Sequence, residues 1–195
     1  IDNFAEITKE VVAPGGKVTL FPVNVVTSLE VSGQEALSST TLGPYVATSP
    51  GQLGNKIAID IIFARGLYYA NDNGGLDQVS VSWLVEAQQL DDYGAAIGGW
   101  INLGSETYKA ATSTPQRLSY SYGVPLGRYQ VRLTRTSAKS TDSRCGNDLN
   151  WGSLRTYLPG DQSYGNVTLV AMRMRATNSL SSQASRKVNM IVTRR

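Results

Sequence analysis

The sequence contains no histidine and a single cysteine, Cys145, among its 195 residues. Without histidine, Ser-His-Asp and Cys-His catalysis, histidine-ligated zinc and the most common general base are all excluded. One cysteine cannot form an internal disulfide, which is compatible with assembly in a reducing cytoplasm. The longest apolar runs fall well short of the roughly 18 residues of a membrane-spanning helix, so none is predicted.

The chain also has little excess of charge. Lysine and arginine total 18 against 15 acidic residues, which gives a net charge of +3. The arginines are spread along predicted strands, so the sequence lacks the basic cluster typical of nucleic-acid binding. With 19 glycines and 41% hydrophobic residues, the composition favours an all-β chain with many turns and a packed core.

The strongest local pattern is the run GRYQVRLTRT at residues 127–136. Apolar side chains alternate with long polar ones, as in a strand that is buried on one face. Tyr129 precedes the apolar Val131 by two residues and follows a turn at 124–127. Sandwiches of the immunoglobulin and fibronectin type place a tyrosine there, with its hydroxyl tied back to the preceding turn. The run therefore predicts a central strand of a β-sandwich.

Further alternating runs predict the other strands. In the middle of the chain they are 56–64, 79–88, 98–103, 108–112, 117–122 and 151–158. Nearer the two ends they are 3–12, 17–21, 24–31, 42–47, 167–177 and 187–193. Residues 137–150 are predicted as a long polar loop that carries Cys145.

Two turn-rich segments, 49–54 and 159–161, predict the domain organisation. The last two strands are expected to form a hairpin, which is marginal alone and needs the strands of the N-terminal segment. We therefore expect a discontinuous small β-barrel or sheet domain, formed by 1–52 plus 160–195. A fibronectin/Ig-like sandwich, 53–159, is inserted between its halves, because insertion at surface turns costs little stability.

Acidic residues offer two chemical alternatives, and neither is well supported by spacing. Asp72, Asp77, Asp91 and Asp92 lack the ligand spacing of a calcium loop, and solvated loop acids are the simpler interpretation. Glycoside hydrolysis needs two carboxylates at a defined separation, and Glu86 or Glu106 could pair with Asp91 or Asp60. Nothing in the sequence sets the distance between the two carboxylates.

Other motifs of catalysis are missing or incomplete. Cys145 lies beside Arg144, but a cysteine nucleophile would have no histidine partner. The glycines form no phosphate-binding loop. We therefore predict no catalytic, cofactor-binding or metal-binding residue, no cofactor, and a protein that is not an enzyme.

Two sets of side chains are candidates for binding. Arginines on strand faces suit a subunit interface, because the planar guanidinium pairs with carboxylates through two hydrogen bonds. The arginines in question are Arg128, Arg132, Arg173 and Arg175. The alternative is a carbohydrate-binding module, in which Trp100 and Tyr108 contact a glycan.

Five stretches, taken together, resemble the tail-tip host-specificity protein J family of long-tailed bacteriophages, also called the central tail fibre or tail hub protein. They follow the family's order across nearly the whole chain. The stretches are LFPVNVVTSLEVSGQEAL (20–37), IAIDIIFARGLYY (57–69), ATSTPQRLSYSYGVPLGRYQVRLTRTSAKSTDS (111–143), WGSLRTYLP (151–159) and VTLVAMRMRATNSLSSQASRKVNMIVTRR (167–195).

The resemblance implies a virion protein of the distal tail tip, assembled in the cytoplasm of the host bacterium. Members of the family form a trimeric hub, assemble with other tail-tip proteins and bind a host receptor. Receptor recognition usually lies far towards the C-terminus, so it is expected in regions outside this chain. The chain begins at Ile1 without an initiator methionine, and we expect it to be a piece of a longer protein.

Overall fold

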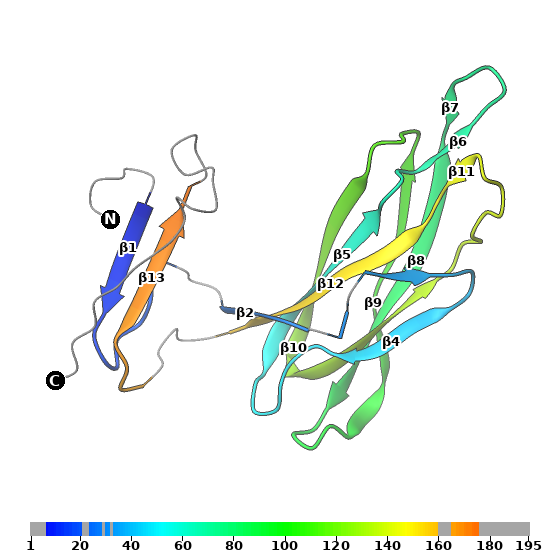
Figure 1. The fold of residues 1–195 in the computed structure, drawn as a ribbon. Helices are drawn as coiled ribbons and strands as arrows, with labels where there is room; N and C mark the ends of the chain where they lie inside the picture. The colour runs from blue at the N-terminus through cyan, green and yellow to red at the C-terminus, as the bar shows by residue number, and fades with distance from the viewer. Residues whose placement is uncertain (1–6, 21–23, 29, 32, 160–164, 176–195) are drawn as a thin grey trace. The chain divides into compact units, whose positions relative to one another are not determined.

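The structure is a computed structural model that describes residues 7–20, 24–28, 30–31, 33–159 and 165–175. The chain forms two compact units: Asn24–Pro159, and Ile1–Val23 together with Gly160–Arg195. All regular structure in the described residues is β-strand (Figure 1). The expected all-β class is therefore confirmed. None of the described residues forms a helix with the length and apolar character needed to span a membrane.

The larger unit is a sandwich whose two layers share one long strand, β10 (Gln116–Arg135). Its first half pairs with β5 at Gln116–Gly123, and its second half pairs with β8 at Arg128–Arg135. The first layer runs β2 (Asn24–Thr27), β12 (Leu149–Leu158), β5 (Gly54–Phe63) and β10, with β3 (Gln34–Ala36) beside β2 on the edge of β12. The second layer runs β4 (Thr41–Val46), β10, β8 (Val79–Leu90) and β9 (Ala96–Ala110).

The core lies between the layers. It is formed by the apolar side chains that alternate with polar ones along the strands. Trp83 of β8 and Trp151 of β12 are fully buried, together with Phe63 of β5. Phe63 and Trp83 come from different layers, and their rings lie 6.3 Å apart. Burying an aromatic or large aliphatic side chain stabilises a fold by roughly 1.5–3 kcal/mol, so these contacts join the layers.

The strand prediction was right in kind and wrong in some boundaries. The expected strands 98–103 and 108–112 are parts of β9, and 117–122 and 127–136 are parts of β10. Residues 17–20 are not a strand. Three short strands that alternation did not predict form a separate small sheet: β6 (Tyr68–Ala70), β7 (Leu76–Asp77) and β11 (Cys145–Gly146).

The first domain boundary differs from the expected one. Residues 24–52, expected in the discontinuous domain, contain β2, β3 and β4, which pair with β12 and β10 of the sandwich. The units divide after Val23 and after Pro159. Asn24 lies opposite Leu158 in the β2–β12 pair, so the chain enters and leaves the sandwich at neighbouring positions. This is the geometry of an inserted unit.

The second unit contains an antiparallel pair formed by opposite ends of the chain. β1 (Ile7–Val12) pairs with β13 (Leu169–Met174), with Val12 opposite Leu169. Residues 187–193, which are expected to form a hairpin with the strand at 167–177, lie outside the described residues. In the sequence, β1 and β13 are separated by all the residues of the sandwich. Their pairing joins the N-terminal and C-terminal parts of the second unit.

The predicted tyrosine corner is confirmed. The Tyr129 hydroxyl donates a hydrogen bond of 2.9 Å to the carbonyl oxygen of Pro125, and the ring is only 2% exposed. Burial raises the pKa of Tyr129, so the hydroxyl keeps its proton and remains a donor. The bond braces the crossing of β10 between the layers, next to the register shift between Gly123 and Gly127.

Replacing Tyr129 with phenylalanine should lower the free energy of unfolding by about 1 kcal/mol, because the Pro125 carbonyl then loses its buried donor. Urea unfolding of the whole chain checks this value. The control is Tyr93→Phe, since Tyr93 is 98% exposed and the change should stay within about 0.5 kcal/mol. Equal unfolding midpoints for both variants would contradict the structural role of the corner.

Candidate interaction surfaces

The outer face of the second layer carries the best-defined polar cluster. The Arg132 guanidinium of β10 lies 4.0 Å from the centre of the Trp100 ring of β9. Its Nε donates to the Glu86 carboxylate of β8 at 2.7 Å. Strand pairing places these side chains together, because Arg132 lies opposite Glu86. Cation–π stacking and an ion pair therefore act on one guanidinium, whose side chain is 31% exposed.

Trp100 and Tyr108, the predicted glycan contacts, do not form a common platform. Tyr108 packs against the core, where its ring stacks on Phe63 at 5.7 Å and its hydroxyl donates to Gln116. Trp100 lies instead against the partly exposed Arg132. One ring is therefore partly buried against the core, and a face of the other is covered by a guanidinium.

Arg128 was predicted at a subunit interface, and the structure corrects this. Its side chain is 7% exposed and is directed towards backbone oxygens of its own chain. Nη1 donates to the carbonyls of Asp91 at 2.9 Å and Asp92 at 3.2 Å, and Nε donates to the carbonyl of Thr48 at 3.2 Å. A guanidinium held in this way joins two turns of the sandwich and is not available to another subunit.

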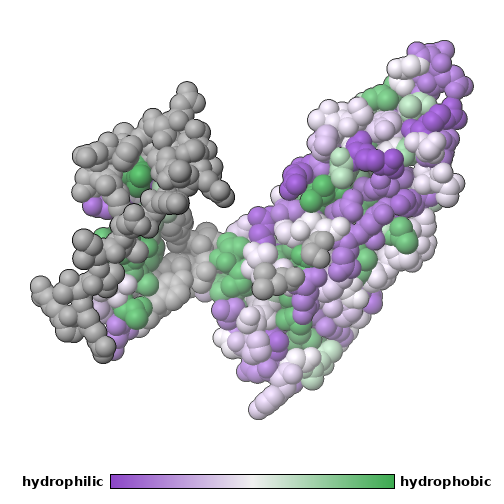
Figure 2. All heavy atoms as spheres, viewed as in Figure 1, coloured by the Kyte–Doolittle hydropathy of each residue, from purple (hydrophilic) through white to green (hydrophobic). Residues whose placement is uncertain are grey.

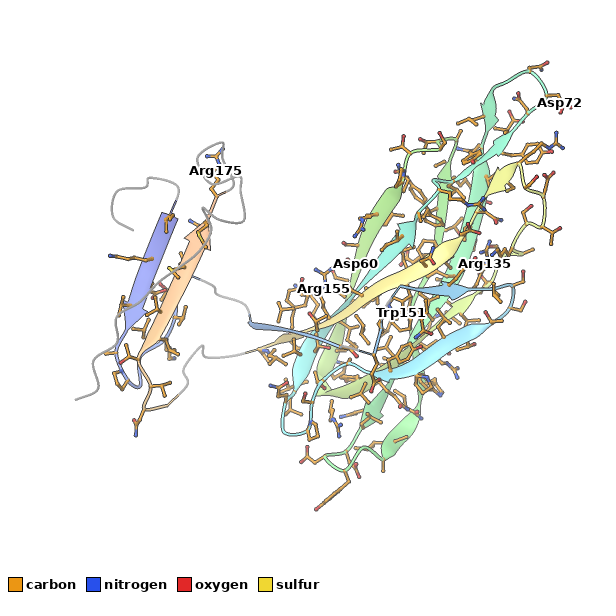
Figure 3. All side chains as sticks on the ribbon, viewed as in Figure 1. Asp60, Asp72, Arg135, Trp151, Arg155 and Arg175 are labelled. Carbon is orange, nitrogen blue, oxygen red and sulfur yellow. The ribbon has the colours of Figure 1, made fainter. Side chains whose placement is uncertain are left out.

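The other two arginines of the predicted interface lie in the second unit. Arg173 of β13 lies opposite Thr8 of β1, and both Arg173 and Arg175 are exposed. Figure 3 labels Arg175. They remain accessible, as the prediction requires. Arg132 belongs to the sandwich, so the predicted arginines do not all lie in one unit.

Asp60 and Glu106, two of the acids considered for hydrolysis, are engaged in hydrogen bonds. Asp60 of β5 accepts from Ser119, Ser153 and Arg155 (Figure 3 labels Asp60 and Arg155). Partial burial alone would raise the pKa of Asp60, but these hydrogen bonds and the Arg155 charge outweigh it and lower the pKa. Glu106 accepts from the Tyr122 hydroxyl at 3.3 Å.

The acids considered for calcium are also used locally. Asp72 pairs with Arg144 at 2.7 Å, and Asp77 accepts from Asn71 at 2.9 Å. Asp91 Oδ1 accepts the backbone N–H groups of the turn that follows β8. Asp72 lies in the turn before β7, Asp77 in β7 itself, and Asp91 and Asp92 in the turn after β8, so the four acids do not share one loop.

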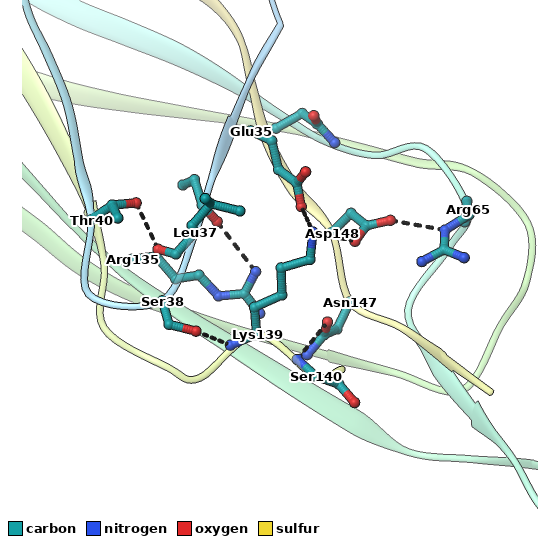
Figure 4. A network of polar contacts seen from close by, with 12 residues as sticks. Glu35, Leu37, Ser38, Thr40, Arg65, Arg135, Lys139, Ser140, Asn147 and Asp148 are labelled. Atoms are coloured by element: carbon teal, nitrogen blue, oxygen red, sulfur yellow. Dashed lines mark hydrogen bonds and ion pairs between the residues drawn. The ribbon is translucent and has the colours of Figure 1, made fainter. Parts of the chain in front are cut away.

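A buried cationic network was missed by the sequence analysis (Figure 4). Arg135 is fully buried and donates to the carbonyls of Ser137 and Ala138 at 3.0 Å and of Ala36 at 3.4 Å. Burial lowers the pKa of Arg135, although the neighbouring Glu35 and Asp148 act in the opposite direction. Arg135 is in phase with Val131 and Leu133, so its place on the apolar face was the signal.

Ion pairs extend this network to partly exposed side chains. Lys139 bonds Glu35 and lies 3.4 Å from Asp148, which also accepts from Arg65 at 2.8 Å. Burial would raise the pKa of Asp148, but the bonds and charges of Arg65 and Lys139 lower it overall. The network fixes the residues after β10 and the start of β12, so its evident role is structural.

A cavity of about 410 Å³ lies beside Arg128, between the end of β2 and the turn after β4. Its lining includes Glu30 and Thr48. Glu30 accepts the N–H of Val46 at 3.1 Å, on the edge strand β4. This bond occupies one backbone donor of β4.

Comparison with known proteins agrees with this architecture. The family model of the tip attachment protein J FNIII-A domain matches residues 29–160. That match covers more than half of the chain and nearly coincides with the compact unit Asn24–Pro159. The chain belongs to this family. It is therefore a phage tail protein with a fibronectin type III-like sandwich, as the sequence resemblance implied.

Two structural comparisons give weaker likenesses. A chain in the structure of infectious bursal disease virus Gx strain aligns with a TM-score of 0.39 and 12% identity, over 80% of this chain and 37% of that one. A chain of the T13 IBDV viral particle aligns with a TM-score of 0.42 and 11% identity, over 83% and 37%. The J-family chain thus spans about 37% of their length, and such scores carry no functional argument. No curated protein matches the sequence.

The Arg132–Trp100 contact should be measurable by a double-mutant cycle. Arg132→Ala, Trp100→Ala and the double variant should give a coupling of about 0.5–1 kcal/mol in urea unfolding, because the stacked guanidinium stabilises the ring. A matched cycle of Arg132→Ala with Tyr93→Ala, whose side chains share no contact, should be additive within about 0.5 kcal/mol. Additivity in both cycles would show that the stacking is not energetically significant.

Proposed function

We propose that this J-family chain is a structural module at the distal end of a phage tail, with roles in tail assembly and host attachment. The observation that supports this most is the agreement between the family match at 29–160 and the compact unit at 24–159. A family match that ends where a physical unit ends concerns a whole folded module and not a shared motif.

The proposed mechanism is the presentation of a rigid sandwich from a larger assembly. The sandwich begins and ends at the adjacent Asn24 and Leu158, so it can be inserted without separating the strands before and after it. β1 and β13 pair across the insertion. In this proposal the second unit forms a homotrimer, which also contacts other tail-tip proteins. The sandwich lies on the outside of that assembly.

Exposed arginines are the proposed contacts between subunits. Arg173 is exposed within β13, Arg175 is exposed just after it, and Arg132 is partly exposed on the sandwich. Arginine is favoured at interfaces because its fork binds carboxylates with defined geometry. Arg128 is left out of this set, since its guanidinium is bonded within its own chain.

We propose that the protein is not an enzyme. This is supported by a sequence without histidine, and by the hydrogen bonds that occupy the acids needed for hydrolysis. Asp60 is held by serines and Arg155, and Glu86 by Arg132. A glycan platform formed by Trp100 with Tyr108 is not carried forward, because the partly buried Tyr108 stacks on Phe63 of the core.

Light scattering of the full-length protein, including the regions that flank this chain, should give three times the monomer mass. The full-length protein is needed because flanking regions contribute contacts in a trimeric hub. Combined charge reversal, Arg173→Glu with Arg175→Glu, should shift the mass towards the monomer, while the matched reversal Lys109→Glu on β9 should not. A full-length wild-type protein that is only monomeric would contradict the trimer.

A further inference from the structure

The turn between β8 and β9 is held by its own hydrogen bonds, in a pattern that the turn at 71–75 also has. It spans residues 91–95, and Asp91 bonds across it through its N–H to the carbonyl of Ala95 at 2.9 Å. Asp91 Oδ1 accepts the N–H of Tyr93 at 2.9 Å and of Ala95 at 2.8 Å. The Gly94 N–H donates to the carbonyl of Asp91 at 3.1 Å, with Gly94 at a positive φ of 89°.

Arg128 of β10 braces the same turn. Its Nη1 bonds the carbonyls of both Asp91 and Asp92, while Nε bonds Thr48 in the neighbouring turn. Because the guanidinium is 7% exposed, these charge-assisted bonds are shielded from water. The turn therefore has a conformation set by the folded core.

The braced turn displays Tyr93. Its side chain is 98% exposed, more than any other large hydrophobic residue in the described part of the chain. Tyrosine is enriched among the residues that dominate binding energy, because a large ring with a hydroxyl is ordered at little entropic cost. A pre-organised backbone lowers that cost further.

The chemistry of the turn indicates the kind of partner. Its backbone groups are already bonded to Asp91 and Arg128, so few remain for the hydroxyls of a sugar. What it offers is a protruding ring, flanked by the exposed Asp92. The complementary surface is a concave apolar pocket with a basic rim, which a folded protein supplies.

The size of the contact distinguishes a transient partner from a permanent one. Permanent subunit interfaces bury large, mostly apolar areas, whereas brief encounters bury little. Figure 2 shows the hydrophobic residues on the visible face of the sandwich in small groups among hydrophilic ones. A single anchor with an acidic neighbour suits a reversible contact.

We propose that residues 91–95 are a recognition tip, whose Tyr93 inserts into a basic-rimmed apolar pocket of a host-surface protein during reversible attachment. This rests on the proposed role in host attachment. It adds a contact to the receptor recognition expected outside this chain. Arg128 is a positioning residue for the tip.

The test measures the rate at which intact virions adsorb to host cells, at equal virion numbers. Tyr93→Ala should lower the rate at least about tenfold, because a central aromatic anchor is lost. Tyr93→Phe keeps the ring and should lower it less. The matched control is Leu76→Ala, a 39% exposed residue of β7, which should leave the rate unchanged.

Treated cells identify the partner. Digesting surface proteins with protease should remove the difference between wild-type and Tyr93→Ala virions, while periodate oxidation of surface glycans should preserve it. The inference is overturned if Tyr93→Ala virions adsorb normally, or if periodate and not protease removes the difference. It is also overturned if the variant lowers virion yield while adsorption per virion is normal, because the partner is then a tail protein.

The proposed function has its own readout in the same experiment. Mass spectrometry of purified wild-type virions should detect the chain. If the chain is missing from virions, the structural role itself fails, and the recognition tip fails with it. If the chain is present and adsorption is indifferent to Tyr93, only the recognition tip is wrong.

Discussion

The sandwich depends on one strand that serves both of its layers. β10 pairs with β5 through its first half and with β8 and β4 through its second. The crossing between the halves is braced by the Tyr129–Pro125 hydrogen bond. Because the same backbone forms ladders in both layers, neither layer can shift its register without displacing the other. The packed aromatic core of Phe63, Trp83 and Trp151 follows from that alignment.

Three arginines of β10 have different roles within eight residues. Arg128 is bonded to two turns, Arg132 lies on the outer face with Glu86 and Trp100, and Arg135 is buried among backbone carbonyls. Alternation predicted the outer position of Arg132. It also placed Arg135 in the apolar phase, which was a readable signal of burial. Nothing local indicated that Arg128 is covered, because the turn that covers it, 91–95, lies far away in the sequence.

The same distinction explains which parts of the fold could be predicted. The apolar phase of β5, β8 and β10 and the tyrosine corner are local patterns, and these predictions are confirmed. Strand partners are non-local, so the pairing of β2 and β4 with the sandwich could not be read from composition shifts near residue 52. Among the candidate contacts, strand pairing brings Trp100 to Arg132. Tyr108 faces the core because it lies opposite Val81, which is fully buried.

The central claim is that residues 24–159 form one cooperative sandwich, separate from the β1–β13 pair. Hydrogen exchange of the whole chain in low denaturant tests it most directly, because cooperative units open together. The account predicts that amides of β2, β4, β5, β8, β10 and β12 share one opening free energy, while those of β1 and β13 exchange independently. The account would be contradicted if the amides of β2 and β4 exchanged together with those of β1 and β13 and independently of those of β10.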